Sequence, residues 1–469
     1  MRQHTAILAA TLAAALTAAA CAGGPAREPG AAPVPGRPGT GTHGAEPLPP
    51  SPDIPVTFAL DAHAITTPGY HDETSIAIDP TDSLRLVAAW QIPATIGAST
   101  DGGVTWRSSP LPGVERWQLS GDPVVGYDAD GHAYALYIAF DRPEDYDTLG
   151  KAAHRNGIFV NRSDDGGSTW RPEPTAVIEQ PERAGVPFED KPAFAIDRGR
   201  DPARRGAVYV AWTEFRRNES VILFARSTDG ARTFGAPVVL SDRPGSPKDS
   251  VGAAEGTDVA VAPDGTVYVV WSDSTGILMD RSTDGGRTFG RDVRIARTPD
   301  IVFGVHGVER ANGYPSLEID PRSGRMYVMW VDVRATRPEP YLSTSDDGGV
   351  RWTLPTPVAG VGANGEPRFF AWMSVDPVTG LVAVSYYRGS SGGRLEYVLA
   401  TSRDGGGAFI ERAWSARPFD PRGQFLGDYT GVAAHAGTVV AAWTELAPAD
   451  SGSAGVGPLR RPGTRIVIG

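Results

Sequence analysis

The chain has 469 residues, too many for one ordinary domain, so the sequence predicts either several domains or one large repeat fold. Its formal net charge of -11 excludes the usual basic kind of nucleic-acid-binding protein, because phosphates would repel it. The single cysteine, Cys21, excludes an intramolecular disulfide and a cysteine metal site in the remainder of the chain.

Residues 1–21 have the pattern of an export signal. Arg2 precedes a stretch rich in small residues and leucine, and Cys21 directly follows three alanines. This arrangement resembles a bacterial lipobox, whose cysteine becomes the lipidated first residue of the mature protein. We therefore expect a lipoprotein signal peptide with lipidated Cys21, which exports the protein and anchors it to the outer face of the cell membrane. Plain signal cleavage beside a free cysteine is the alternative.

Residues 22–54 are rich in proline, glycine and alanine and poor in large apolar side chains. Such a segment cannot bury a core, so the sequence predicts a disordered tether between the anchor and a folded domain over residues 55–469.

An octapeptide of the form Ser-x-Asp-Gly-x-x-x-aromatic recurs six times. Asp-Gly is a tight-turn signal, since Asp bonds nearby backbone N–H groups and glycine accepts a positive φ. The serine can add a second local bond, and the aromatic ring can pack beneath the turn. We expect β-hairpin tips, and a metal-binding loop is the weaker alternative because each copy has only one or two carboxylates. The copies span residues 99–106, 163–170, 227–234, 282–289, 345–352 and 402–409.

The same strand pattern precedes the octapeptides. Before the fourth copy, the sequence predicts a strand from Thr257, a Pro-Asp-Gly turn, a second strand ending at Trp271 and a third strand from Gly276. A fourth strand follows the octapeptide. The apolar residues 267–270 do not alternate with polar ones, so we expect both faces of the sheet to be covered by neighbouring sheets.

A seventh strand pair, at residues 429–435 and 438–443, has no octapeptide after it. The last residues, 465–469, predict a third strand, and residues 55–60 could supply the fourth from the other end of the chain. Joining both ends in one sheet removes exposed edges. The prediction is an all-β fold, a seven-bladed β-propeller of four-stranded blades closed by N- and C-terminal strands, with a six-bladed ring as the alternative.

The octapeptides resemble the Asp-box (BNR) repeats of the sialidase superfamily of β-propellers, and the resemblance covers nearly the whole chain from Pro55. It implies that the octapeptides lie on the face away from the active site. It also implies, for a true sialidase, a tyrosine nucleophile with a glutamate, an aspartate acid/base and three arginines on the substrate carboxylate. The Arg-Ile-Pro motif of that family is absent, because the nearest string, Trp90-Gln-Ile-Pro93, has glutamine in place of arginine.

In each predicted blade, the start of the first strand and the end of the second strand lie on the face opposite the octapeptides. We call this face of the propeller the mouth. Carboxylates recur there, and a ring of turn-capping aspartates is the structural alternative. Capping does not explain the arginines and tyrosines, which occur in only some blades. We predict catalytic roles for Asp428, Tyr429, Asp122 and Asp190, and ligand-binding roles for Arg310, Tyr314, Arg368, Arg388, Glu214 and Asp258.

Two functions remain open. One is a lipid-anchored, exo-α-sialidase-like glycoside hydrolase acting on glycans, and the other is a non-catalytic glycan- or protein-binding propeller that uses the same mouth. We expect a monomer without a cofactor. The acidic turns at residues 79–82 and 128–131 could hold Ca²⁺ but are more typical of plain hairpin turns. The charged insertion at residues 141–155 is a candidate lid, with a solvated loop as the alternative.

Overall fold

Seven larger sheets, whose strands are mainly antiparallel, and one two-stranded sheet are present in the described part of the chain in the computed structural model. The chain divides into residues 1–46 and residues 47–469, and all described residues belong to the second part. The predicted signal peptide, Cys21, nearly all of the tether and most of the insertion at residues 141–155 lie outside the described residues. No helix among the described residues is long and apolar enough to cross a membrane. The described residues are 54, 57–58, 62–67, 69–141, 154–183, 185–249, 252–298, 301–335, 337–358, 365–447 and 464–469.

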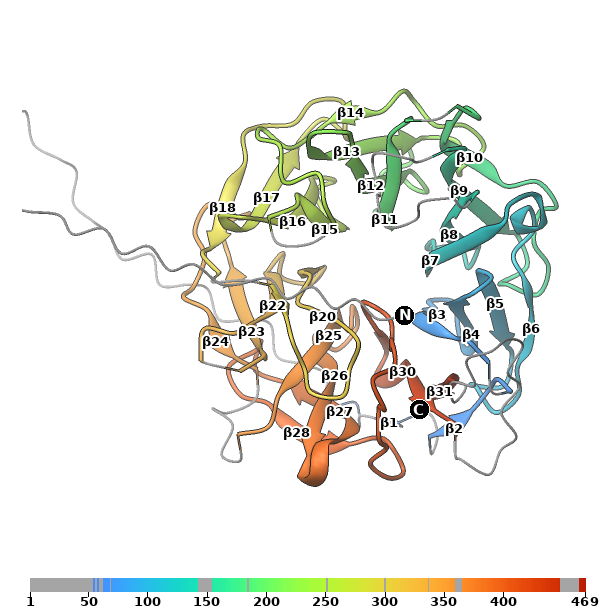
Figure 1. Ribbon diagram of the computed structural model, residues 1–469. Helices are drawn as coiled ribbons and strands as arrows, with labels where there is room; N and C mark the ends of the chain where they lie inside the picture. Colours follow the sequence, from blue (N-terminus) through green and yellow to red (C-terminus); the bar gives the residue numbers. More distant parts are fainter. Residues whose placement is uncertain are drawn as a thin grey trace, which may run out of the picture. The chain divides into compact units, whose positions relative to one another are not determined.

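We number the seven larger sheets as blades 1 to 7 in chain order, and each of the first six consists of four consecutive strands from the inside of the ring outward (Figure 1). Their strands are β3 (Asp72–Asp79), β4 (Asp82–Gln91), β5 (Thr95–Ser99) and β6 (Arg107–Pro110) in blade 1; β7 (Leu119–Tyr127), β8 (Ala133–Phe140), β9 (Asn156–Ser163) and β10 (Thr175–Gln180) in blade 2; β11 (Phe188–Ile196), β12 (Val208–Phe215), β13 (Ser220–Ser227) and β14 (Val238–Val239) in blade 3; β15 (Glu255–Val261), β16 (Val267–Asp273), β17 (Gly276–Ser282) and β18 (Val293–Ala296) in blade 4; β21 (Ser316–Ile319), β22 (Met326–Asp332), β23 (Glu339–Ser345) and β24 (Thr356–Pro357) in blade 5; and β25 (Arg368–Val375), β26 (Val382–Ser390), β27 (Arg394–Ser402) and β28 (Ile410–Ala413) in blade 6. Outside the blades lie the 3-10 helices η1 (Val114–Arg116) and η3 (Ser391–Gly393) and the hairpin of β19 (Val302–Phe303) and β20 (Ala311–Asn312).

Blade 7 joins both ends of the described chain, which confirms seven blades closed by N- and C-terminal strands. Its strands are β29 (Gly431–His435), β30 (Thr438–Leu446), β31 (Thr464–Ile468) and β2 (His63–Ala64).

The predicted position of the closing strand, residues 55–60, is wrong in detail. The fourth strand is β2, which pairs with β31, whereas β1 (Thr57–Phe58) pairs in parallel with the start of β30. Gly469 hydrogen-bonds with Ala441, so β31 does not cover Thr438 and β1 takes its place there.

The ring closes through the inner strands, since each contacts the inner strand of the next blade and β29 contacts β3 (Figure 1). In the described residues, one apolar cluster fills each of the seven spaces between neighbouring blades. Val267 and Val269 pack toward blade 3, and Tyr268 and Val270 pack toward blade 5. This two-sided burial explains why apolar residues in the second strands do not alternate with polar ones.

The octapeptides form the predicted hairpin tips. In the first copy, Ser99 Oγ donates to Asp101, and the backbone N–H groups of Gly103 and Thr105 donate to Ser99 and Asp101 at 2.8 and 2.9 Å. The other five copies repeat the serine–aspartate bond. The aromatic ring of each copy packs against an inter-blade cluster, as Trp106 does between blades 7 and 1.

The octapeptides and the starts of the inner strands lie at opposite ends of each blade. In blade 4, Ser282 at the start of the octapeptide pairs with Val267, while Glu255 at the start of the inner strand pairs with Ser272 at the far end. The chemistry predicted for the inner-strand starts is therefore separated from the repeated turns.

Candidate functional site

The inner strands share one backbone irregularity. In five blades a β-bulge shifts the pairing of the first strand with the second near its start. The bulged residue has a φ between 48° and 73°, a left-handed conformation that costs a non-glycine residue about 1–2 kcal/mol. Strain of this kind often occurs at functional sites. The bulged residues are Glu73, Asp122, Lys191, Gly256 and Phe370, and Tyr314 and Tyr429 occupy the matching places in blades 5 and 7.

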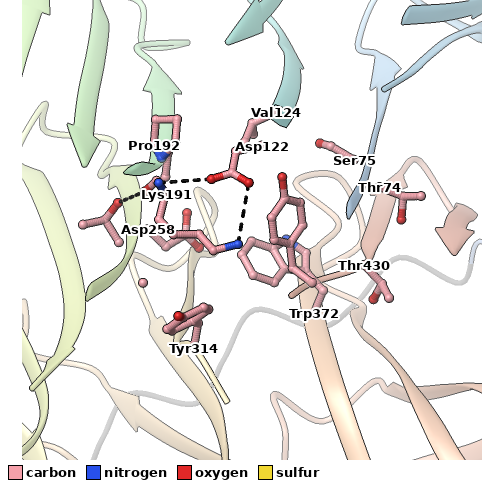
Figure 2. A pocket seen from close by; sticks show the side chains of 14 residues that line it. Thr74, Ser75, Asp122, Val124, Lys191, Pro192, Asp258, Tyr314, Trp372 and Thr430 are labelled. Atoms are coloured by element: carbon pink, nitrogen blue, oxygen red, sulfur yellow. Dashed lines mark hydrogen bonds and ion pairs between the residues drawn. The ribbon is translucent and has the colours of Figure 1, made fainter. Parts of the chain in front are cut away.

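A cavity of about 60 Å³, enough for a few water molecules, lies on the axis of this ring, because all seven blades contribute to its wall. The wall combines hydroxyl, carboxyl, ammonium and aromatic groups (Figure 2). The lining residues are Thr74, Ser75, Asp122, Val124, Lys191, Pro192, Ala193, Gly256, Thr257, Asp258, Tyr314, Trp372, Tyr429 and Thr430.

Lys191 is the centre of charge in this cavity. Its Nζ lies 3.1 Å from Asp428, 3.6 Å from Glu73 and 3.9 Å from Asp122. It also lies 4.6 Å from the ring centroid of Tyr429. Burial works against the charge, but the surrounding carboxylates raise the pKa of Lys191 well above its ordinary value. The neighbouring carboxylates therefore favour the charged form of the ammonium group.

Asp122 is the ionised member of a group of carboxyls. Burial alone would raise its pKa, but Lys191 and hydrogen bonds with Glu73 and Asp190 outweigh burial and lower the pKa of Asp122. Figure 2 shows its carboxyl group joined to the Nζ of Lys191 and to the backbone N–H of Lys191, which donates to it at 3.2 Å. Burial, with the nearby Asp122 charge, raises the pKa of both Glu73 and Asp190 well above the usual range. Among these three acidic side chains, only Asp122 has surroundings that lower its pKa.

Asp428 is held by three basic or amide side chains. Arg310 donates to both carboxylate oxygens, and Asn312 donates to Oδ1 at 2.8 Å. Lys191 approaches Oδ2. Arg310 also donates to Asp249 at 3.2 Å, so its guanidinium group is engaged by two carboxylates. These bonds give Asp428 a positioning role for Lys191.

The two tyrosines of the ring stay neutral. Burial, followed by the nearby charges of Glu255 and Glu73 respectively, raises the pKa of Tyr314 and Tyr429 well above the ordinary value. The hydroxyl group of Tyr429 donates to the carbonyl of Pro123 at 3.4 Å. A phenol held neutral in this way donates a hydrogen bond and becomes a nucleophile only when a base takes its proton, so the nucleophilic role of Tyr429 stays a prediction.

Asp258 is the second carboxyl group in the cavity wall. It accepts a hydrogen bond of 2.7 Å from the backbone N–H of Leu317 in the next blade. Ser75 occupies the matching place in blade 1 and accepts the same inter-blade bond through its hydroxyl group, from the backbone N–H of Val125. That bond therefore does not require a carboxyl group. Burial raises the pKa of Asp258 to about 7, which leaves it able to give or take a proton near neutrality.

Four of the six predicted ligand-binding residues lie outside the cavity wall, and one of them, Arg310, contacts Asp428 behind it. Arg368 and Arg388 both pair with Glu411, at 3.3 and 3.0 Å, on the strand faces of blade 6. Glu214 accepts a hydrogen bond of 2.6 Å from Arg216. Arg368 also pairs with Glu339 of blade 5 at 3.2 Å, so all three side chains are engaged away from the cavity and the structure does not bring them into the site.

The other predicted residues do come together, either in the wall or one contact behind it. They are Asp122, Asp190, Asp258, Arg310, Tyr314, Asp428 and Tyr429. The prediction did not single out Lys191, Glu73 or Trp372. Lys191 could have been found, because the chain has only three lysines among 44 basic residues and one of them lies at an inner-strand start.

Comparisons with known proteins were made at the level of sequence and of structure. The sequence matches no family model and no curated protein. Similar solved structures include a polysaccharide lyase of the ulvan lyase family PL25, at 11% identity over 86% of this chain and 95% of that chain, with a TM-score of 0.49. A Hadza microbial sialidase is 16% identical over 76% of this chain and 70% of that one, with a TM-score of 0.44. An α-L-arabinofuranosidase from Fusarium graminearum is 14% identical over 72% of this chain and 98% of that chain, with a TM-score of 0.44. At these identities the likeness concerns the fold alone.

Proposed function

We propose that the protein is a glycoside hydrolase that acts at the axial cavity, with Asp258 as the general acid and Asp122 as the carboxylate. The observation that carries this proposal is the pair of carboxyl groups in one wall with opposite surroundings. Asp122 is paired with an ammonium group, whereas Asp258 accepts hydrogen bonds from the backbone N–H groups of Leu317 and Val259 and from the side chain of Ser316. Two carboxyl groups kept in different protonation states are what glycosidic bond hydrolysis requires.

In the proposed reaction, Asp258 gives its proton to the leaving oxygen as the bond between that oxygen and the anomeric carbon breaks. Asp122 takes a proton from the water whose oxygen bonds to the same carbon. The two products together contain the added water, Asp122 releases its proton to solvent, and Asp258 is reprotonated from solvent. Trp372 offers an aromatic face for a sugar ring, and Thr74, Thr257 and Thr430 offer hydroxyl groups.

The charges favour neutral or amino sugars over carboxylated sugars. Lys191 is the single basic side chain in the described cavity wall, and three carboxylates surround it. The guanidinium groups of Arg310, Arg368 and Arg388 are all engaged by carboxylates as well. A substrate carboxylate would therefore compete with several built-in anions. Sialosides, which the Asp-box resemblance suggests, belong in the test as the contrasting substrate.

The test is a panel of 4-nitrophenyl glycosides of neutral, amino and sialic sugars, together with the matching natural disaccharides. We expect Asp122→Asn to lower kcat by at least about a hundredfold on every substrate. Asp258→Asn should lower kcat strongly on the disaccharide but little on the 4-nitrophenyl glycoside, because a good leaving group needs no proton. Wild-type kcat/KM should fall above about pH 7, where Asp258 loses its proton.

Asp229→Asn, in an octapeptide turn at the other end of its blade, is the matched control and should leave turnover unchanged. Equal activity of Asp258→Asn and wild type on the disaccharide would overturn the assignment.

A second candidate is a non-catalytic glycan-binding propeller. It is favoured by the ion pairs of Asp428 with Lys191 and Arg310, which engage these charged side chains with one another. Sugar binding without turnover, lost in Trp372→Ala, would support that function instead.

We further propose that the protein is exported and anchored through lipidated Cys21, with residues 22–54 as a tether, and that it acts as a monomer. The support is the sequence of the leader and its single cysteine. Labelled palmitate should be incorporated by the wild type and not by Cys21→Ser, and only the wild type should sediment with membranes.

A further inference from the structure

A second acidic group lies at the mouth beside the proposed catalytic carboxylate. Asp190, Asp249 and Glu255 each direct one carboxylate oxygen to within 4.8 Å of the others. Asp190 and Glu255 are buried, whereas a fifth of the Asp249 side chain is exposed to solvent. The group is therefore closed on the protein side and open to solvent at one member.

Another acidic trio in the described structure, Asp128, Asp130 and His132, provides a comparison. Asp128 accepts hydrogen bonds from the backbone N–H groups of Asp130 and His132 and from the hydroxyl of Tyr134, and it contacts the His132 ring. Asp130 accepts from Arg205 through both oxygens. The carboxylates of this trio are thus hydrogen-bonded within the turn and to neighbouring side chains, as expected for the plain turn predicted at residues 128–131.

The trio at the mouth differs at one atom. Glu255 is only 3% exposed, and its Oε1 has no hydrogen-bond partner. Leaving a buried polar atom unsatisfied costs about 1–3 kcal/mol. Asp190 accepts from the backbone N–H of Lys191, Asp249 accepts from Arg310, and the Glu255 side chain has a hydrogen bond with Tyr314, so Glu255 Oε1 is left without a donor.

We propose that Asp190, Asp249 and Glu255 bind one hard divalent cation, with Ca²⁺ as the best fit, and that water completes its shell at the open side. An all-oxygen set that includes three carboxylates is typical of hard cations, and Ca²⁺ tolerates irregular geometry better than Mg²⁺. The cation supplies the partner that Glu255 Oε1 lacks, and the exposed part of Asp249 provides its route of entry. The proposal does not depend on glycoside hydrolysis.

The experiment uses the full chain after treatment with EDTA. Isothermal titration with CaCl₂ should show one saturable site in the wild type, and CaCl₂ should raise the Tm because the cation binds only the folded state. Asp249→Asn should weaken Ca²⁺ binding by roughly tenfold or more, since it removes one ligand charge. Asp130→Asn, in the satisfied trio, is the matched control and should bind Ca²⁺ like the wild type.

Glu255→Gln provides a second variant at a buried ligand, and it should abolish the effect of CaCl₂ on the Tm. MgCl₂ serves as the comparison salt and should bind more weakly. The proposal is overturned if the wild type shows no saturable site up to about 10 mM CaCl₂, beyond the weakest range of protein calcium sites. Equal affinity in the wild type and Asp249→Asn would overturn it too.

Discussion

The two ends of the propeller blades differ in how far their residues repeat from one blade to the next. At one end, six octapeptides repeat the same serine–aspartate hydrogen bond, and the aspartates are exposed or nearly so. At the other end, seven matching inner-strand positions carry glutamate, aspartate, lysine, glycine, tyrosine, phenylalanine and tyrosine. Repetition at the first end serves the fold, because every blade needs the same turn. Variation at the second end points to chemistry that no symmetric ring could supply.

The largest effect should come from removing the charge at the centre of the mouth. Lys191→Met leaves Glu73, Asp122 and Asp428 without their common cation, so we expect the free energy of unfolding to drop by about 3–5 kcal/mol. Turnover should be lost as well. Urea unfolding of Lys191→Met beside Lys248→Met, which alters an exposed lysine, measures the difference. A loss below about 1 kcal/mol, the range of exposed ion pairs, would contradict the description of Lys191 as a buried counter-ion.

Two glycines with the same backbone conformation, one at the mouth and one in an octapeptide, allow the two ends of the blades to be compared directly. Gly256 at the mouth and Gly285 in an octapeptide have φ values of 73° and 74°. A Cβ on Gly256 would lie 2.1 Å from Cδ1 of Tyr314, whereas on Gly285 the nearest atoms are 3.8 Å away. Gly285→Ala should therefore cost only the backbone strain, about 1–2 kcal/mol.

Gly256→Ala should cost about 2–4 kcal/mol, because overpacking adds to the strain, and it should impair turnover by moving Tyr314. Thermal unfolding and steady-state kinetics of both variants provide the measurement. If the two variants lose the same stability and both keep full activity, Gly256 is not needed to place the tyrosine ring.

Much of the fold could be predicted because its signals are local. Each octapeptide contains its own turn chemistry, and the unbroken apolar run at residues 267–270 already indicates a sheet covered on both faces. The closing strand was misplaced by a few residues. Which of two short segments pairs with β31 depends on the register between distant strands, and local propensity does not contain that information.

The site was predicted less well because a bulge decides which residue faces the axis. One extra residue at the start of an inner strand changes the side-chain alternation, so Lys191 points into the cavity. Arg368, which also lies at an inner-strand start, instead pairs with Glu339 and Glu411. Sequence spacing places all such residues near the mouth but does not show which of them turn inward.

The pH dependence of stability should have opposite signs at the two ends. Burial raises the pKa of Asp72 at the mouth to about 7, so its contribution to stability is full below about pH 4 and is lost as the pH rises through 7. Between those limits this one group should lower the free energy of unfolding by about 1.4 kcal/mol per pH unit. Hydrogen bonds from Thr233 and Ser227 outweigh the effect of burial and lower the pKa of Asp229 to about 2, so its contribution is present above about pH 4 and is lost on acidification toward pH 2.

Urea unfolding from pH 3 to pH 8 should therefore show a maximum near pH 4–5 and a decline toward pH 8. Asp72→Asn retains an acceptor for the Gln91 amide but cannot ionise, so it should flatten the decline without moving the acid limb. An unchanged slope between pH 5 and 7 in Asp72→Asn would show that other groups cause the decline.

The smallest effect should come from the octapeptide end. Asp229→Ala removes the acceptor for the backbone N–H groups of Arg232 and Thr233 and for the hydroxyl of Thr233. These donors are exposed and can bond to water instead, so the loss should be only about 1 kcal/mol. Because five other copies keep the same turn in their own blades, the ring should stay closed and turnover should not change. Asp229→Ala could instead abolish turnover while its Tm stays within a few degrees of the wild type. The octapeptide end would then have to take part in the chemistry, which would contradict the assignment of fold to one end of the blades and chemistry to the other.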